Sequence, residues 1–106
     1  IYEIIIRTIV VGEGNRQVNQ LHKKSSNLAK AATQAEMVLK LQPFLEEEEE
    51  QIYKRGRNAK SYTAAKNADI IDYRNATGFE ALMGYLYMQG KTKRMFELVK
   101  KGMELL

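Results

Sequence analysis

The chain contains no cysteine, a single histidine and no apolar run long enough to span a bilayer. The absence of cysteine excludes disulfides and thiolate metal sites, and it fits a reducing compartment without requiring one. One histidine cannot complete a zinc site built from histidine and cysteine ligands. Because an apolar span and a signal-peptide pattern are both missing, the sequence predicts no membrane partner.

Several common catalytic motifs are also missing. The sequence has no glycine-rich phosphate loop followed by Lys and Ser or Thr, and it has no dinucleotide-binding fingerprint. It has no serine nucleophile elbow and, without cysteine, no thiol nucleophile. Carboxylate chemistry remains open, because carboxylates hold Mg²⁺ through the oxygen ligands that this ion prefers. Such an ion beside a phosphodiester can activate water and stabilise the leaving oxygen.

Charge is distributed unevenly along the chain. There are 17 basic and 13 acidic residues, which give a net charge of +4. Five of the acids form the run Glu46 to Glu50, so the rest of the chain has 17 bases against eight acids. A strongly basic surface favours a polyanionic partner such as nucleic acid, although excess lysine can also serve solubility alone. The acidic run is explained as the start of a helix, where negative side chains complement the macrodipole.

Length and periodicity predict one small all-α domain. The 106 residues, of which 44% are hydrophobic, suit a single domain. Glycines close some of the apolar periodic segments, and Pro43 ends another. The apolar run 1–11 would also suit a buried strand, but the i,i+4 spacing of Glu3 and Arg7 favours a helix. We therefore expect about six helices, over residues 1–11, 16–24, 27–42, 46–57, 67–89 and 92–106.

Three of these helices carry predictions about packing. Each has large apolar or small side chains that recur with the helical period and define an inward side. Small residues in the helix 67–89, among them Gly78 and Gly84, would let a neighbouring helix approach closely. The predicted inward positions are Leu28, Ala31, Ala32, Ala35, Val38, Leu39 and Leu41, then Phe79, Leu82, Met83, Leu86 and Tyr87, and finally Met95, Leu98, Val99, Gly102 and Leu106.

Glu80 is an acid among the apolar residues of the helix 67–89. It follows Phe79 by one position, so it lies at the edge of the buried face rather than opposite it. A carboxylate in this place is either a solvated flank of the helix or a cation ligand at the rim of a groove. One carboxylate is a weak signal by itself, and at least one more acid would be needed to anchor an ion.

Two basic segments are candidates for contacts with a phosphate backbone. Residues 56–66, GRNAKSYTAAK, are expected to form a loop in which basic side chains alternate with Asn, Ser, Tyr and Thr. These residue types hydrogen-bond phosphate and sugar rather than read bases, and an ordinary solvated connection is the alternative. The segment HKKSS, at 22–26, would supply a second contact, unless His22 only bonds a carbonyl or water at a helix end.

Three segments together resemble the Mini-ribonuclease III family. They are LHKKSS at 21–26, RGRNAKS at 55–61 and KNADIIDYRNATGFEALMGYLY at 66–87, and they occur in the order found in the family. The phrase ATGFEALMGYLY is also similar to the second acidic signature of ribonuclease III domains in general. The resemblance covers essentially the whole chain. It implies one all-α ribonuclease III-type catalytic domain over 1–106, incomplete at its N-terminus and without a double-stranded RNA-binding domain.

The resemblance also implies an activity. The family consists of cytoplasmic homodimers that cleave both strands of double-stranded RNA with Mg²⁺, for which Mn²⁺ is a substitute, and that mature the 23S ribosomal RNA precursor. Glu80 would be the metal-binding catalytic glutamate, and Thr77 stands where larger ribonuclease III enzymes have a further acid. The family's catalytic Asp would lie two residues before Ile1, so a protein of this extent is expected to be inactive or nearly so. The residues expected to bind RNA are His22, Lys23, Lys24, Arg55, Arg57, Asn58, Lys60, Lys66 and Arg74, although Arg74 could equally pair with a helix neighbour.

Two other functions fit the same residues. A non-catalytic RNA-binding or ribosome-associated module would share the helices but lack the acid pair. An Asp two positions before Ile1 would favour the enzyme over that module. A helical dimer with a basic surface and no RNA role would show no salt-sensitive binding of duplex RNA.

Overall fold

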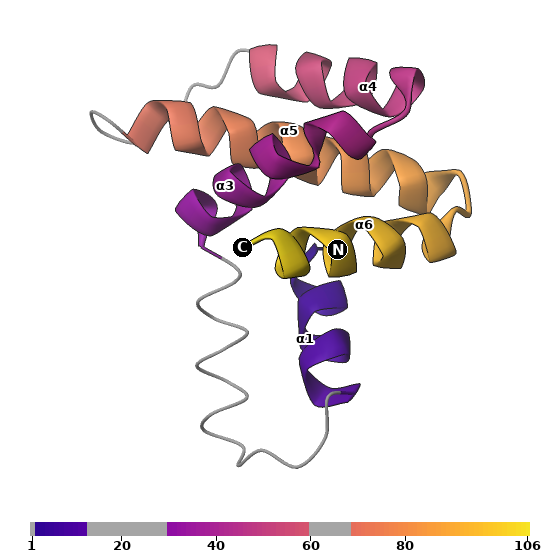
Figure 1. Ribbon diagram of the computed structural model, residues 1–106. Coiled ribbons are helices and arrows are strands. Elements are labelled where there is room, and N and C mark those ends of the chain that lie inside the picture. The colour runs from indigo at the N-terminus through magenta and orange to yellow at the C-terminus, as the bar shows by residue number, and fades with distance from the viewer. Residues whose placement is uncertain (1, 13–29, 60–68) are drawn as a thin grey trace.

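The computed structural model describes residues 2–12, 30–59 and 69–106. Over these ranges the chain is helical and has no strand, which confirms the all-α prediction. None of the helices in this part of the chain has the length and apolar character needed to cross a membrane. The helix expected over 16–24 lies outside the described residues. The elements are α1 (Tyr2–Gly12), α3 (Ala31–Leu41), the 3₁₀ helix η1 (Gln42–Phe44), α4 (Glu47–Asn58), α5 (Asp69–Met88) and α6 (Thr92–Leu105) (Figure 1).

Helix α5 is the centre of the fold. It packs against α4, α3 and α6, and Figure 1 shows α4 and α6 on opposite sides of it. Full burial of an apolar side chain contributes about 1.5–3 kcal/mol, so the buried side of α5 is a main source of stability. The prediction that Tyr87 faces inward is wrong, because this side chain is 58% exposed. The predicted inward residues that are buried are Phe79, Leu82, Met83 and Leu86.

The first turn of α1 is fixed between α5 and α3. The Tyr2 ring packs edge-on against the Phe79 ring, with 5.3 Å between the ring centroids and 62° between the planes. The Tyr2 hydroxyl lies 3.8 Å from the sulfur of Met37 on α3. Helix α1 also contacts α6. The buried residues of α1 have the spacing of one helical face, and they are Tyr2, Ile5, Ile6 and Ile9.

Helix α3 differs from its prediction in its start and in its inward side. It begins at Ala31 rather than near residue 27, because Lys30 has an extended backbone, with φ −64° and ψ 145°. It ends at Leu41, and Pro43 lies in the 3₁₀ turn that follows, which confirms the predicted stop. The prediction that Ala31, Ala32 and Leu39 face inward is wrong, since all three are exposed. The helix is turned so that its buried residues are Gln34, Ala35, Met37, Val38 and Leu41.

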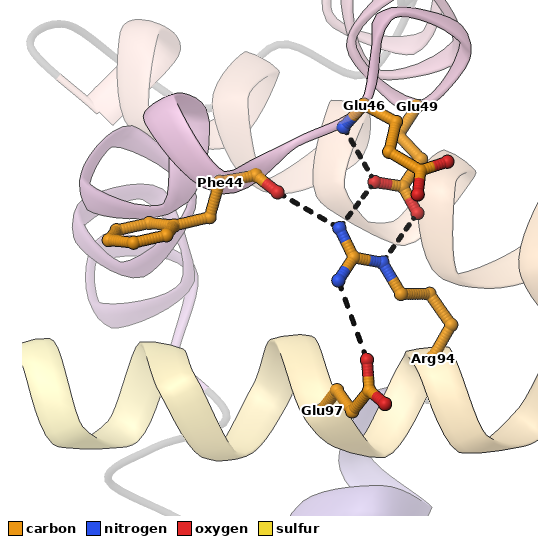
Figure 2. Close-up of polar contacts among 5 residues, drawn as sticks. All are labelled: Phe44, Glu46, Glu49, Arg94 and Glu97. Atoms are coloured by element: carbon orange, nitrogen blue, oxygen red, sulfur yellow. Dashed lines mark hydrogen bonds and ion pairs between the residues drawn. The ribbon is translucent and has the colours of Figure 1, made fainter.

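An ion pair fastens the N-terminal end of α4 to α6 (Figure 2). Arg94 donates from Nε and Nη2 to the two carboxylate oxygens of Glu49, over 2.8 Å in each case. Nη2 also donates to the carbonyl oxygen of Phe44, 2.9 Å away. Glu49 accepts a further bond from the amide of Glu46, which caps the helix. The Glu49 side chain is only 7% exposed and that of Arg94 is 26% exposed, so the pair is largely shielded from water.

The ion pair gives one member of the acidic run a more specific role than helix-end charge. Burial alone would raise the pKa of Glu49, but the hydrogen bonds from Arg94 and from the Glu46 amide hold that pKa below its ordinary value. The hydrogen bond to Glu49 raises the pKa of Arg94 in turn. Glu49 therefore remains ionised inside the structure, and it holds α4 against α6.

A contact between glycines holds the C-terminal end of α4 against α5. A Cβ placed on Gly56 would lie 2.6 Å from the Ala81 Cβ and 3.0 Å from the Gly78 Cα. A Cβ on Gly78 would lie 2.6 Å from the Tyr53 carbonyl oxygen. The two helices thus approach at a distance that only glycine permits. The prediction of a loop beginning at Gly56 is wrong, because α4 continues through Asn58.

Two later glycines behave differently from each other. Gly84 does not mediate a close contact as predicted, since a Cβ there would meet nothing within 4 Å in the described part of the chain. Gly90 ends α5 as predicted: its φ is +72°, and the amides of Gly90 and Lys91 donate to carbonyl oxygens in the last turn of the helix. In α6 the prediction for Leu106 is wrong, because it is 42% exposed. The predicted inward residues Met95, Leu98, Val99 and Gly102 are buried.

Candidate active site

Glu80 lies on the exposed side of α5, next to the first turn of α1. Its neighbour Phe79 points into the core and contacts Tyr2, whereas Glu80 itself is exposed. Burial raises the pKa of Tyr2, and the negative charge of Glu80 raises it further. The carboxylate is therefore close enough to the Tyr2 hydroxyl to disfavour a second negative charge there. Both interpretations of Glu80, a solvated flank of the helix and a cation ligand, require an accessible carboxylate, and the geometry supplies one at the α1–α5 junction.

The chemistry of a single exposed carboxylate suits an ion that keeps much of its water. Thr77, one helical turn earlier, donates its hydroxyl to the carbonyl oxygen of Tyr73 over 2.8 Å and adds no charge. Within residues 2–12, 30–59 and 69–106, no group of three or more His, Cys, Asp or Glu side chains converges on a point. An exposed carboxylate fits Mg²⁺, which binds few protein oxygens and several waters. It does not fit zinc, which takes nitrogen and sulfur ligands.

Basic and polar side chains gather at the C-terminal end of α4. Arg55 and Asn58 are exposed, and Arg57 is half-buried. Arg57 donates from Nε to the Asn58 side-chain oxygen over 3.1 Å, and its guanidinium lies over the Tyr53 ring, 5.6 Å from the ring centroid. Positive side chains at this end also complement the negative end of the helix dipole. The structure therefore places three of the candidate RNA-binding residues together.

The same stretch of α5 carries Glu80 and receives the basic end of α4. Gly56 meets α5 at residues 77, 78 and 81, on both sides of Glu80 in the sequence. Near the other end of α4, the Tyr85 hydroxyl donates to the Glu48 carboxylate, so the two helices run antiparallel. The basic end of α4 consequently points toward the N-terminal half of α5, where Arg74 is exposed. Successive residues of a helix are about 100° apart around its axis. Glu80 therefore lies on the side of α5 next to the one where Ala81 contacts the basic end of α4.

The remaining candidate residues cannot be placed. They lie outside the described residues, and they are His22, Lys23, Lys24, Lys60 and Lys66.

Sequence reasoning gave no role at the site to two tyrosines that shape this region. Tyr2 fixes the start of α1 beside Glu80, and Tyr53 lies under Arg57 at the α4–α5 contact. Both are fully buried. One local signal for the contact between Tyr53 and Arg57 is their spacing of four residues, which brings the two side chains to one helical face.

Comparisons with known proteins identify relatives of this chain. The profile of the Ribonuclease III domain family matches residues 1–91. The Mini-ribonuclease 3 of Brevibacillus brevis is 50% identical over 101 residues, which cover 95% of this chain and 75% of that protein. The Mini-ribonuclease 3 of Clostridium tetani is 48% identical over 101 residues, covering 94% of this chain and 67% of that protein.

The fold also has a solved counterpart. A crystal structure of a protein from Fusobacterium nucleatum superposes with a TM-score of 0.79 at 23% identity, covering 97% of this chain and 82% of that one. At this level of identity the likeness concerns the fold alone. The family profile and the sequence relatives identify the family. The chain therefore belongs to the ribonuclease III domain family of endoribonucleases, in its Mini-ribonuclease 3 branch.

Proposed function

We propose that the protein is a Mg²⁺-dependent endoribonuclease that cleaves double-stranded RNA in the cytoplasm, and that its natural substrate is the 23S ribosomal RNA precursor. One observation carries this proposal: Glu80 is an exposed carboxylate beside the first turn of α1. In this family the first acidic signature leads directly into that turn. A second carboxylate preceding Ile1 would thus approach Glu80 from α1 and complete a pair.

Glu80 would hold the ion and fix its place relative to the helices. When bound, Mg²⁺ supplies a water of lowered pKa and positive charge for the leaving oxygen of a phosphodiester. Tyr2 keeps the two helices in register, because its buried ring is packed between Phe79 and Met37. Thr77 contributes no charge, so the ion's net positive charge stays available to the phosphate.

The basic end of α4 would bind the RNA backbone. Double-stranded RNA is recognised mainly by its A-form shape and through 2′-hydroxyl and phosphate contacts. Arg55, Arg57 and Asn58 supply charged and amide donors of the kind that such contacts use. Arg74 on α5 would extend the same surface. Because these contacts are ionic, affinity should fall steeply as salt is raised.

We also propose that the active unit is a homodimer. Glu80, Gly84 and Tyr87 are spaced i, i+4 and i+7, so they share one face of α5. That face presents a tyrosine that is 58% exposed, followed by Met88 at 81%, with open space in front of Gly84. A second copy packed there would bring its own Glu80 close to the interface between the two copies. In sedimentation, Tyr87→Glu should convert a dimer into monomers; an unchanged sedimentation coefficient would move the interface elsewhere.

The direct test is cleavage of duplex RNA with and without Mg²⁺, by a version of the protein extended upstream to include the family's first acidic signature. Glu80→Gln should reduce the rate by at least about 10³-fold, because the neutral amide cannot balance the ion's charge. Binding of duplex RNA by that variant should persist. Glu104→Gln, at an exposed position on α6, is the matched control and should cleave normally. Binding without any cleavage by the extended protein would favour the non-catalytic module, and full turnover by Glu80→Gln would reject the assignment of Glu80.

A further inference from the structure

We infer that Tyr53 is a positioning residue for RNA binding: its buried ring holds the Arg57 guanidinium in a fixed place at the basic end of α4. The inference rests on the RNA-binding function proposed above. It assigns a role to a side chain that itself has no access to a ligand, since Tyr53 is 0% exposed.

The contacts that the described residues make with Arg57 use only part of its guanidinium. The guanidinium carbon lies 5.6 Å from the centroid of the Tyr53 ring, within the range of a cation–π interaction. Nε donates to the Asn58 side-chain oxygen over 3.1 Å. Among the described residues, no hydrogen bond engages the two terminal amino groups. The guanidinium is thus held by its face and by one nitrogen, and within the described residues the two terminal amino groups keep the paired donors that match a phosphate.

Tyr53 is itself held by two neighbours on α5. Its hydroxyl donates to the side-chain oxygen of Asn75 over 3.0 Å, and Asn75 is only 7% exposed. The edge of the ring packs on Gly78, where an added Cβ would lie 2.8 and 2.9 Å from two ring carbons. The ring can therefore neither rotate nor withdraw without moving α4 from α5. Arg57 lies one turn farther along the same helix, with its guanidinium over this ring, so the fixed ring also restricts the guanidinium.

A fixed arginine binds more tightly than a mobile one. A long side chain normally loses rotamer freedom when it contacts a ligand, and a side chain held beforehand loses less. The planar guanidinium suits this arrangement, because it can lie on a ring and still present paired donors, whereas a lysine ammonium cannot. Arg55 offers an internal comparison: it lies on the same helix end but is exposed.

The test measures binding of a short RNA duplex without Mg²⁺ over a series of salt concentrations. Arg57→Ala should weaken binding and reduce the slope of log K against log salt by about 0.7–0.9. Tyr53→Leu should weaken binding by about 3- to 10-fold and leave the slope unchanged, because the charge is retained. Tyr53→Phe keeps the ring and should restore binding. Tyr85→Leu removes a tyrosine from the opposite end of the α4–α5 contact and should bind RNA normally.

The decisive measurement is the double variant. If the ring acts through Arg57, Tyr53→Leu should have no further effect on binding when Arg57 is already alanine. An equal loss in both backgrounds would show that the ring only supports α4 in general, and would overturn the inference. Should Tyr53→Leu fail to fold, Arg57→Lys is compared with Arg55→Lys, and equal losses would overturn it as well. Unaltered binding by Arg57→Ala would have the same consequence, whereas a wild-type chain with no salt-sensitive duplex binding would reject the proposed function instead.

Discussion

Replacing Arg94 with leucine should destabilise the protein far more than removal of an ordinary surface charge. The change leaves the Glu49 carboxylate, 7% exposed, without the two donors that lie 2.8 Å away. It also removes the donor to the Phe44 carbonyl. Breaking a buried ion pair by removing one partner costs about 3–5 kcal/mol. Because the Arg94 side chain is 26% exposed, water can partly rehydrate the site, and we expect about 2–3 kcal/mol.

For a domain of this size, that loss corresponds to a fall in Tm of about 10–20 °C. Thermal and urea denaturation followed by circular dichroism, at one protein concentration, would measure it. The exposed pair of Lys54 and Glu50, 3.3 Å apart, is the matched control, and Lys54→Leu should cost less than about 0.5 kcal/mol. Adding Glu49→Gln to Arg94→Leu should recover part of the loss, because the buried charge is then gone. Equal effects of Arg94→Leu and Lys54→Leu, or no recovery in the double variant, would refute the reasoning.

Three further predictions concern pH and glycine. Because the folded protein holds the pKa of Glu49 below its ordinary value of 4.5, the ion pair stabilises the fold fully above that pH and loses this effect as the pH falls through the lower folded value. Acid titrations of stability should therefore show a shallower loss for Glu49→Gln than for the wild type. Gly78→Ala should lower the free energy of unfolding by about 1–3 kcal/mol, because its Cβ would meet the Tyr53 carbonyl oxygen at 2.6 Å. Gly84→Ala lies in open space within a helix, and it should stabilise the monomer by about 0.5–1 kcal/mol. Gly90→Ala should cost about 1 kcal/mol, because a φ of +72° is unfavourable for alanine; denaturation midpoints of the three variants would rank them.

Much of the fold could be predicted because its helices carry local signals. The apolar period of α5, its end at Gly90 and the inward side of α6 from Met95 to Gly102 each depend on residues a few positions apart. The inward side of α3 was predicted less well, because its alanines gave a weak pattern. The choice between Met37 and Leu39 depended on where Tyr2 lies, which no local pattern contains.

For the candidate site, too, local features could be predicted and features that depend on helix packing could not. Position 80 at the edge of the buried face indicated an accessible carboxylate, and the structure agrees that it is exposed. Its proximity to Tyr2, and the stacking of Arg57 on a tyrosine that is itself fixed by Asn75, follow from how helices cross. The pairing of Glu49 with Arg94, 45 residues away in the sequence, could not be distinguished in advance from any other pairing within the acidic run.

The contact between Gly56 and Gly78 fixes the position of α4 on α5. The exposed side chains of the last turn of α4 take no part in that contact. A larger residue at either glycine would displace the whole helix, whereas Arg55 faces solvent at the end of that helix. Exchanges at this outer position can therefore alter the charge of the helix end without a penalty in folding. The exposed chemistry of the helix end can thus diverge on a backbone that scarcely changes.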